Sequence, residues 1–587
     1  MKSVALCLVL SVITVSAIDI ELPELQVHPD KPEVSPGAQS EKDFFRKVGL
    51  LLRKQGAQAD LGYRGSSFSG TGIAIAGMAL RHPQTEHFHA ELPFPFWIFA
   101  HHGMTSGAED VLQGQGHAAA TLHLGFPAIE RSRLILNAGV GEKNWHWSDA
   151  GAVKAVEGET AAGGAAVFAG HERRDRIDYS DNNLERIYGG GWVQRRTESA
   201  RSDLAVGISD KRFGARGYYG VNPEWGARER LEDRLLLMGH TEHMAQSTAR
   251  FSALARETVD NYRLDFGTPD IYENHHRTRI AGGMAALDTR LSSVWSLHMR
   301  GSAENEELNS NRLGVHERTR AAVLLAPVWN HGEIFSVTAG GEYSAFSSES
   351  SVLLPLFRTI FNICANTALF AGYSQRERQP SFTELNYESP GSLGNEGLDR
   401  EKITTIDGGI QRILPRGVMT RLTVFQRTTR NTVDWIKQTV DEPRWLATDV
   451  GKVTTRGAEL RGTGQWRDKV RLLFQYTLLD RDYDLNPHAA RYVLDYPRHQ
   501  LLTGMDWHIC RTVTLSVVNT LQVRDKIESR QERTGIDGTL RMEWSPVRTT
   551  GLRIALLCDN LWDDDFAEYV GQPAAGRRWG IELRTEL

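Results

Sequence analysis

Histidines gather in one short segment of the N-terminal part of the chain. His82, His87 and His89 lie close together, and His101 and His102 follow soon after. Imidazole nitrogens are common ligands of copper, zinc and iron, so this segment is a candidate contact for a metal or a metal chelate. The alternative, which we favour, is a polar loop whose histidines hydrogen-bond to neighbouring structure; no metal site is certain.

Motifs of enzymes are absent or incomplete. Gly114–Ala119 matches the GxGxxA pattern of dinucleotide-binding folds, but no acidic residue on a second strand of a βαβ unit accompanies it. The sequence has no phosphate-binding P-loop, no HExxH zinc motif and no GxSxG nucleophile elbow. We therefore expect a protein without catalytic residues and without a cofactor.

Composition and charge exclude several further classes. The chain has 587 residues, of which 40% are hydrophobic and 24% charged, which does not fit a disordered tail, a collagen or a small disulfide scaffold. The formal net charge is −5 and no basic stripe emerges, which argues against nucleic acid as a partner. Outside the N-terminus no apolar run has the length of a membrane helix, but barrel strands hide their apolar residues by alternation.

The N-terminus has the features of an export signal. Lys2 precedes the apolar stretch Val4–Ile13, and Ala17 supplies the small residue expected before cleavage. Residues 1–17 are therefore predicted to be a signal peptide, because the apolar stretch is too short for a retained membrane anchor. Residues 18–40 are acidic and proline-rich, as expected for a flexible extension.

Cysteines add little to the functional prediction. Cys7 would leave with the signal peptide, and Cys364, Cys510 and Cys558 are widely spaced. No CxxC pair occurs, so neither a zinc site nor a redox motif is indicated. The three remaining cysteines allow one disulfide, but we expect isolated buried thiols.

From about residue 131 to the end, short stretches with period-two alternation recur between turns rich in Gly, Asn, Asp, Ser and Pro. In the last stretch Ile581 and Leu583 fall on one face, while Glu582 and Arg584 fall on the other. A strand between lipid and a wet lumen requires this pattern. A soluble β-sandwich also alternates, but sandwiches of about 100 residues repeat as separate domains, and no linker interrupts this region.

Several segments, in order along most of the chain, resemble TonB-dependent outer-membrane receptors, and the vitamin B12 and siderophore receptors in particular. The segments that carry the resemblance are Leu61–Phe68, Gly72–Leu80, His82–His87, Glu91–Pro93, Gly114–Leu124, Arg378–Leu385, Asn395–Leu398, Asp434–Ile436, Asp449–Leu460, Tyr496–His499 and Asp559–Trp562. Each motif is weak alone, and their order makes the match specific.

The resemblance implies an all-β membrane barrel of about 22 antiparallel strands with a small α/β plug domain inside the lumen. Residues 41–130 would form the plug and residues 131–587 the barrel. Such a receptor resides in the bacterial outer membrane and takes up a scarce large solute, here a ferric siderophore, haem or a corrinoid. Its partners would be the solute, membrane lipid, and TonB with its inner-membrane energising complex.

The resemblance also suggests two sets of site residues. A short stretch after the signal resembles a TonB box, which pairs as an added strand with TonB; the alternative is a plain linker. This stretch consists of Glu21, Leu22, Pro23, Glu24, Leu25, Gln26 and Val27. The loop at the plug apex would contact the substrate through His82, Gln84, His87 and His89.

Three departures from the family pattern carry consequences. Gly103 and Ala76 stand where the plug usually has acidic residues, which puts its internal salt bridges, and transport itself, in question. Leu587 replaces the usual final Phe but keeps an apolar end. A structural or adhesive barrel with a non-transporting plug is therefore the alternative function, and a secreted β-rich enzyme is a third that lacks a catalytic constellation.

Overall fold

The computed structural model describes most of the chain after residue 44. The described residues are 45, 48–55, 57–87, 90, 92–178, 181–220, 224–264, 272–347, 349–439, 441–467, 469–485, 487–526, 532–546, 551–569 and 574–587. The predicted signal peptide, the stretch Glu21–Val27 and His89 lie outside them. Among the described residues, no helix has the length and apolar content that crossing a membrane requires.

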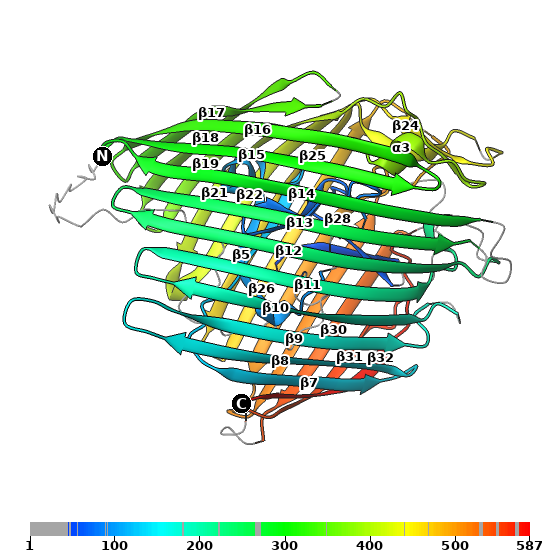
Figure 1. Cartoon of the computed structure of the whole chain (residues 1–587), viewed down its shortest axis with the longest axis horizontal. Coiled ribbons are helices and arrows are strands. Elements are labelled where there is room, and N and C mark those ends of the chain that lie inside the picture. The colour runs from blue at the N-terminus through cyan, green and yellow to red at the C-terminus, as the bar shows by residue number, and fades with distance from the viewer. Residues whose placement is uncertain are drawn as a thin grey trace, which may run out of the picture.

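Twenty-two antiparallel strands form a closed barrel, as predicted (Figure 1). They are β7 (Arg133–Gly141), β8 (Trp145–Glu157), β9 (Ala162–Arg174), β10 (Leu184–Arg196), β11 (Ala200–Gly214), β12 (Arg228–Met244), β13 (Ser247–Arg263), β14 (Glu273–Arg290), β15 (Trp295–Ser310), β16 (Gly314–His331), β17 (Phe335–Phe346), β18 (Val352–Cys364), β19 (Thr367–Arg378), β21 (Glu401–Leu414), β22 (Val418–Arg430), β25 (Val453–Trp466), β26 (Val470–Tyr483), β28 (Pro497–His508), β29 (Val513–Arg524), β30 (Thr534–Trp544), β31 (Arg553–Asp559) and β32 (Arg578–Glu586).

The first and last strands close the sheet. β32 pairs with β7 from Gly580 opposite Gly141 to Glu586 opposite Ile135. Neither strand is left with a free edge, so the backbone groups along this seam are paired within the sheet.

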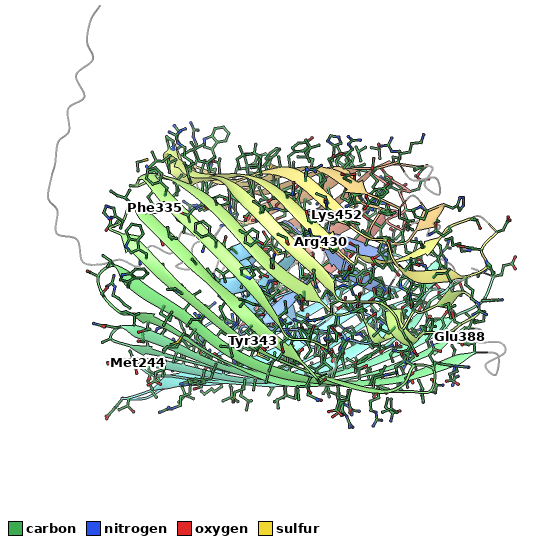
Figure 2. The ribbon with its side chains drawn as sticks, turned by 90° about the horizontal axis from the view of Figure 1, so that it is seen from above. Met244, Phe335, Tyr343, Glu388, Arg430 and Lys452 are labelled. Atoms are coloured by element: carbon green, nitrogen blue, oxygen red, sulfur yellow. The ribbon has the colours of Figure 1, made fainter. Side chains whose placement is uncertain are left out.

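Alternation along the strands separates an outer apolar face from a polar inner face. In β32 the side chain of Ile581 is 52% exposed on the outside, whereas Glu582 is 5% exposed and Arg584 2%. The predicted facing of this strand is therefore confirmed. Figure 2 shows the side chains that project outward around the barrel.

A small α/β unit, the plug, precedes the barrel in sequence. Its elements are β1 (Leu51–Gln55), β2 (Gln58–Gly62), β3 (Thr71–Ile75), β4 (Met78–Ala79), η2 (Phe96–Ile98), β5 (Ala100–Ser106), α2 (Gly107–Gln113) and β6 (Ala120–Gly125). The sheet order is β4-β3-β6-β5, with β3 and β6 parallel, and β1 pairs with β2 as a separate hairpin. Figure 1 shows this blue segment inside the ring of strands.

The two ends of the barrel differ. The turn end carries short connections and the C-terminal residue, whereas the loop end carries η3 (Tyr218–Gly220), α3 (Phe382–Asn386) and a four-stranded sheet. That sheet consists of β20 (Ser392–Leu393), β24 (Trp445–Asp449), β23 (Val433–Lys437) and β27 (Ala489–Ala490). The short helix η4 (Pro415–Gly417) lies in a connection at the turn end. In Figure 2, Met244 and Phe335 lie at the turn end and Glu388 at the loop end.

The expectation of buried thiols is wrong for two of the three cysteines. Cys364 and Cys510 are exposed and Cys558 is buried, and all three are free. Cys364 ends β18 and Cys510 follows β28, so both lie at connections, where the sheet no longer covers the side chain.

An arginine at position 581 tests the assigned facing. We expect Ile581→Arg to lower the free energy of unfolding by about 2–4 kcal/mol if the site is near the bilayer midplane, and by less near an interface. The measurement is denaturant unfolding in lipid vesicles, with Ile581→Leu as the matched apolar control. If Ile581→Arg unfolds at the same denaturant midpoint as wild type, the assignment of Ile581 to the lipid-facing side is wrong.

Candidate functional site

Aromatic side chains hold one side of the plug against the wall. The rings of Phe126 and Trp192 stack at 5.3 Å, and those of Phe94 and Phe168 lie 5.7 Å apart. These wall residues belong to β9 and β10. The plug therefore buries an apolar surface against this part of the barrel.

Ion pairs hold the other side of the plug. Arg64 Nη2 lies 2.8 Å from Glu459 Oε1 of β25, and both side chains are more than nine-tenths buried. Asp110 Oδ2 lies 2.9 Å from Arg376 Nη2 of β19. Burial alone would raise the pKa of the Asp110 carboxyl, but Arg376 and His123 outweigh it and lower this pKa to about 2.

Ala76 and Gly103, the two departures from the family pattern in the plug, both adopt positive φ values. Ala76 adopts φ 51°, and its carbonyl oxygen accepts a hydrogen bond of 2.6 Å from Ser252 Oγ of β13. Gly103 adopts φ 137°, a value that favours glycine, at an irregularity where β5 pairs with β6. Ion pairs to the wall are thus present although the usual acidic residues are not.

Two of the predicted substrate residues, His82 and Gln84, contact the barrel wall. His82 Nε2 lies 3.3 Å from Thr258 Oγ1, and Gln84 Nε2 donates a 2.8 Å hydrogen bond to Asp260 Oδ2. Both partners belong to β13. Among the described residues of the apex loop, His82, Gln84 and His87 are each less than 9% exposed. The arrangement favours the interpretation in which these histidines bond to neighbouring structure.

His87 joins three distant parts of the chain. Its Nδ1 lies 3.0 Å from Asp60 Oδ2 of the β1–β2 hairpin, and its ring stacks on Phe68 at 3.9 Å. Tyr569, from the last connection at the loop end, donates a 2.7 Å hydrogen bond to the same Asp60 oxygen. Asp60 and Tyr569 carry no recognisable local motif, so sequence patterns could not identify this cluster.

Several polar atoms near the apex have no hydrogen-bond partner in the described part of the chain. They are Gln84 Oε1, Tyr262 OH and Asn274 Oδ1, all on buried side chains. Buried polar groups normally have partners, including ordered water. Ordered water is therefore the natural partner for these three buried atoms.

The segment Arg378–Leu385 fastens the apex loop from above. The backbone N–H groups of Phe382 and Thr383 donate to the carbonyl oxygens of Pro83 and Gln84, at 2.9 Å each. Arg378 Nη1 lies 3.0 Å from Glu86 and also pairs with two further glutamates, Glu384 and Glu401. Burial raises the pKa of Glu86 to about 7, against the opposing effect of Arg378.

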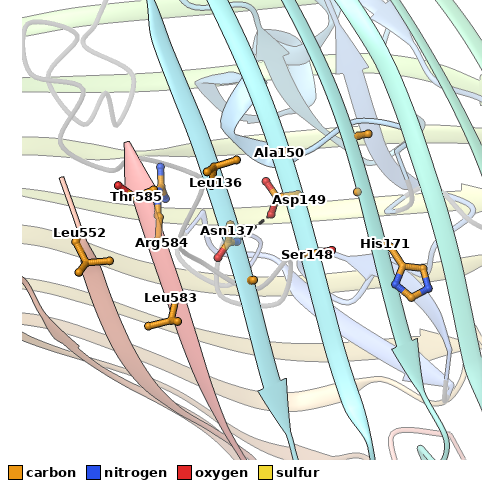
Figure 3. Close-up of a pocket in the computed structure, with 13 residues that line it drawn as sticks. Leu136, Asn137, Ser148, Asp149, Ala150, His171, Leu552, Leu583, Arg584 and Thr585 are labelled. Carbon is orange, nitrogen blue, oxygen red and sulfur yellow. Dashed lines mark hydrogen bonds between the residues drawn. The ribbon is translucent and has the colours of Figure 1, made fainter. Parts of the chain in front are cut away.

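Two other features bear on ligands. Among the described residues, no group of three or more His, Cys, Asp or Glu side chains is placed to hold a metal ion. A hollow of about 540 Å³ is lined by residues of β7, β8, β9 and β32 and by Leu552, which directly precedes β31 (Figure 3). There Asn137 Nδ2 donates to Asp149 Oδ2 at 2.9 Å, and Trp97 of the plug donates to the other Asp149 oxygen, so these polar groups serve plug attachment.

Comparison with known proteins identifies the family. Residues 143–539 match the model described as "TonB dependent receptor-like, beta-barrel", which is more than half of the chain. The chain belongs to the TonB-dependent receptor family. It is therefore a bacterial outer-membrane protein, and the family consists of transport receptors. Because bacterial outer-membrane barrels have short periplasmic turns and longer extracellular loops, the loop end of this receptor is extracellular.

Solved structures share the fold at low sequence identity. The ferric enterobactin receptor PfeA from Pseudomonas aeruginosa has a TM-score of 0.72 at 13% identity, over 93% of this chain and 96% of that one. The FrpB iron transporter from Neisseria meningitidis gives 0.74 at 12%, over 94% and 97%. The copper transporter OprC gives 0.71 at 14%, over 92% and 94%. No curated protein matches the sequence.

Removing the buried Arg64 charge should destabilise the receptor. Arg64→Ala leaves Glu459 buried without its cation, and we expect a loss of about 3–5 kcal/mol in the free energy of unfolding. Denaturant unfolding measures this loss of free energy. The double variant Arg64→Met, Glu459→Gln, which removes both charges, should recover most of it. A loss below about 1 kcal/mol for Arg64→Ala would contradict the assigned role of the pair.

Glu86 should make stability depend on pH. Its folded pKa of about 7 lies above the ordinary 4.5, so the folded chain holds a proton that the unfolded chain releases. The stability that Glu86 contributes is complete below the unfolded pKa and is lost as pH rises through about 7. Between about pH 5 and about pH 8, the free energy of unfolding should therefore fall less steeply with pH for Glu86→Gln than for wild type. If the free energy of unfolding depends on pH equally in wild type and Glu86→Gln, the prediction is refuted. The control is Glu388→Gln, at a side chain that is 73% exposed, which should follow wild type.

Proposed function

We propose that this receptor binds a scarce large solute at its extracellular end and admits it when TonB pulls on the plug. The observation that carries the proposal is the filled lumen: the plug contacts β9 and β10 through aromatic rings and β19 and β25 through buried ion pairs. A solute can pass only if some of these contacts break. Because the sequence has no nucleotide-binding P-loop, the work must come from a partner.

The proposed solutes are a ferric siderophore, haem or a corrinoid. The solved structures with this fold support a metal-bearing solute, since these proteins are named as a ferric enterobactin receptor, an iron transporter and a copper transporter. The unpaired polar atoms of Gln84, Tyr262 and Asn274 at the apex would suit a solute with polar groups at its rim. His82, His87 and His89 remain proposed contacts, reached once the apex loop rearranges.

Growth of a deletion strain decides among these solutes. The strain is supplied with a single ferric siderophore, haem or a corrinoid as the limiting source, and the intact gene is restored in parallel. We expect growth to fail on one source and to return with the gene. Equal growth of both strains on every source would favour the alternative, a structural or adhesive barrel whose plug does not move, which the departures at Ala76 and Gly103 motivate.

Proline in the stretch Glu21–Val27 should separate binding from uptake. We propose that this stretch adds a strand to TonB through main-chain hydrogen bonds, so Gln26→Ala should be mild. Proline removes an N–H donor, and donors face the partner at alternate residues, so at least one of Leu25→Pro and Gln26→Pro should abolish uptake. Cell-bound and internalised solute are measured in a strain with intact TonB. Normal uptake by both proline variants would remove this stretch as the coupling site.

A further inference from the structure

A turn of the barrel holds the tip of the plug hairpin at the extracellular end. The turn, called the latch turn below, comprises residues 215–220 and follows β11 directly. Tyr218 of the latch turn is 0% exposed, and its hydroxyl oxygen accepts a 2.9 Å hydrogen bond from the backbone N–H of Ala57. Lys211 of β11 donates a hydrogen bond to the carbonyl oxygen of the same residue. Both backbone groups of Ala57, which lies between β1 and β2, are therefore bonded to the barrel.

Tyr219 extends the latch turn to the apex loop. Its ring centroid lies 6.2 Å from that of His87 in the apex loop and 5.8 Å from that of Tyr262 in β13. Its hydroxyl donates a 2.7 Å hydrogen bond to Glu229 of β12. Two adjacent tyrosines thus contact two separate plug segments, the hairpin through Tyr218 and the apex loop through Tyr219.

The backbone of Tyr219 is strained. It adopts φ 58° and ψ 23°, in the left-handed region, which a residue with a bulky side chain seldom occupies. Such a conformation persists where the surrounding structure imposes it, and it is found at switch regions. Here the ring and the hydroxyl are held by the apex loop, β12 and β13. We therefore expect the latch turn to relax when these side-chain contacts are lost.

The base of the latch turn is fixed to the neighbouring connection. Asn182, between β9 and β10, is 0% exposed, accepts a 2.9 Å hydrogen bond from the N–H of Arg216 and donates one of 3.1 Å to its carbonyl oxygen. Gly217 adopts φ 75°, a value that favours glycine, and separates this base from the two tyrosines. Movement of the turn is therefore expected at Tyr218 and Tyr219, with Gly217 as the hinge.

We propose that the latch turn locks the plug hairpin in the resting receptor, with Tyr218 and Tyr219 as the positioning residues of this lock. The inference rests on the proposed function, in which the plug must move. A pull from the periplasmic side then cannot withdraw the hairpin until the latch turn releases Ala57. Tyr219 keeps some exposed surface whereas Tyr218 has none, so of the pair only Tyr219 offers surface to an arriving solute.

Hydrogen exchange of the purified full-length receptor in detergent tests the lock. Tyr219→Asn removes the ring and the hydroxyl but keeps a residue that tolerates the left-handed backbone. The Tyr219 hydroxyl bonds to Glu229 and not to the hairpin, yet we expect the amides of residues 57–62 to exchange about threefold to tenfold faster than in wild type. The matched control is Tyr483→Asn in β26, because Tyr483 packs on an apolar cluster that contains no plug residue. The control should exchange as wild type does.

Ion conductance across a planar lipid bilayer shows whether the lock resists opening. The full-length receptor is held in potassium chloride while the urea concentration is raised, and the concentration at which the lumen begins to conduct is recorded. Tyr218→Phe, which removes only the hydroxyl that holds Ala57, and Tyr219→Asn should both conduct at lower urea concentrations than wild type and Tyr483→Asn. Neither TonB nor a solute takes part, so failure here counts against the lock alone, whereas the growth experiment tests the proposed function.

Three results would overturn the proposal. The first is wild-type hairpin exchange in Tyr219→Asn, and the second is conduction by both variants at the wild-type urea concentration. The third is faster exchange in Tyr218→Phe that is confined to the amide of Ala57, because it would show a local hydrogen bond without a lock. If Tyr219→Asn loses the gel mobility of an unheated, folded barrel, Tyr219→Phe replaces it, with faster exchange of the hairpin still required.

Discussion

The closed sheet is the constraint on which the rest of the structure depends. Inside a membrane every backbone N–H and C=O must find a partner within the protein, so a spanning sheet must have no edge. The pairing of β32 with β7 meets this condition after 22 strands. A barrel of that girth encloses a wide lumen, which must be filled if the membrane is to remain a barrier. The plug fills it, and the receptor's chemistry follows from how the plug is held.

The plug is held differently on its two sides. Phe94 and Phe126 pack against aromatic rings of β9 and β10. Exposing these rings to water would cost free energy. Arg64 and Asp110 pair with charges of β25 and β19, and charged groups become easier to separate once water can solvate them. Release of the plug from the wall therefore requires water to reach both kinds of contact.

Sequence patterns predicted the barrel because its evidence is local. Alternation of Ile581 with Glu582 reports the two faces of a strand without knowledge of its neighbours. The apex could not be predicted in this way, since Asp60 joins His87 and Tyr569 across 27 and 509 positions. The histidines were found as a cluster, but their burial depends on those distant partners. Exposure of Cys364 was likewise missed, because it depends on where β18 ends.

The most direct test of the central claim is a crosslink that prevents the plug from leaving the wall. A Cβ at Gly239 of β12 would lie 3.2 Å from the Cβ of Ala76, close to the separation of a disulfide. Ala76→Cys and Gly239→Cys are introduced together after Cys364 and Cys510 are replaced by serine. The account predicts that the oxidised receptor binds solute normally but takes none up, and that a reductant restores uptake. Normal uptake through a fully crosslinked receptor would contradict it.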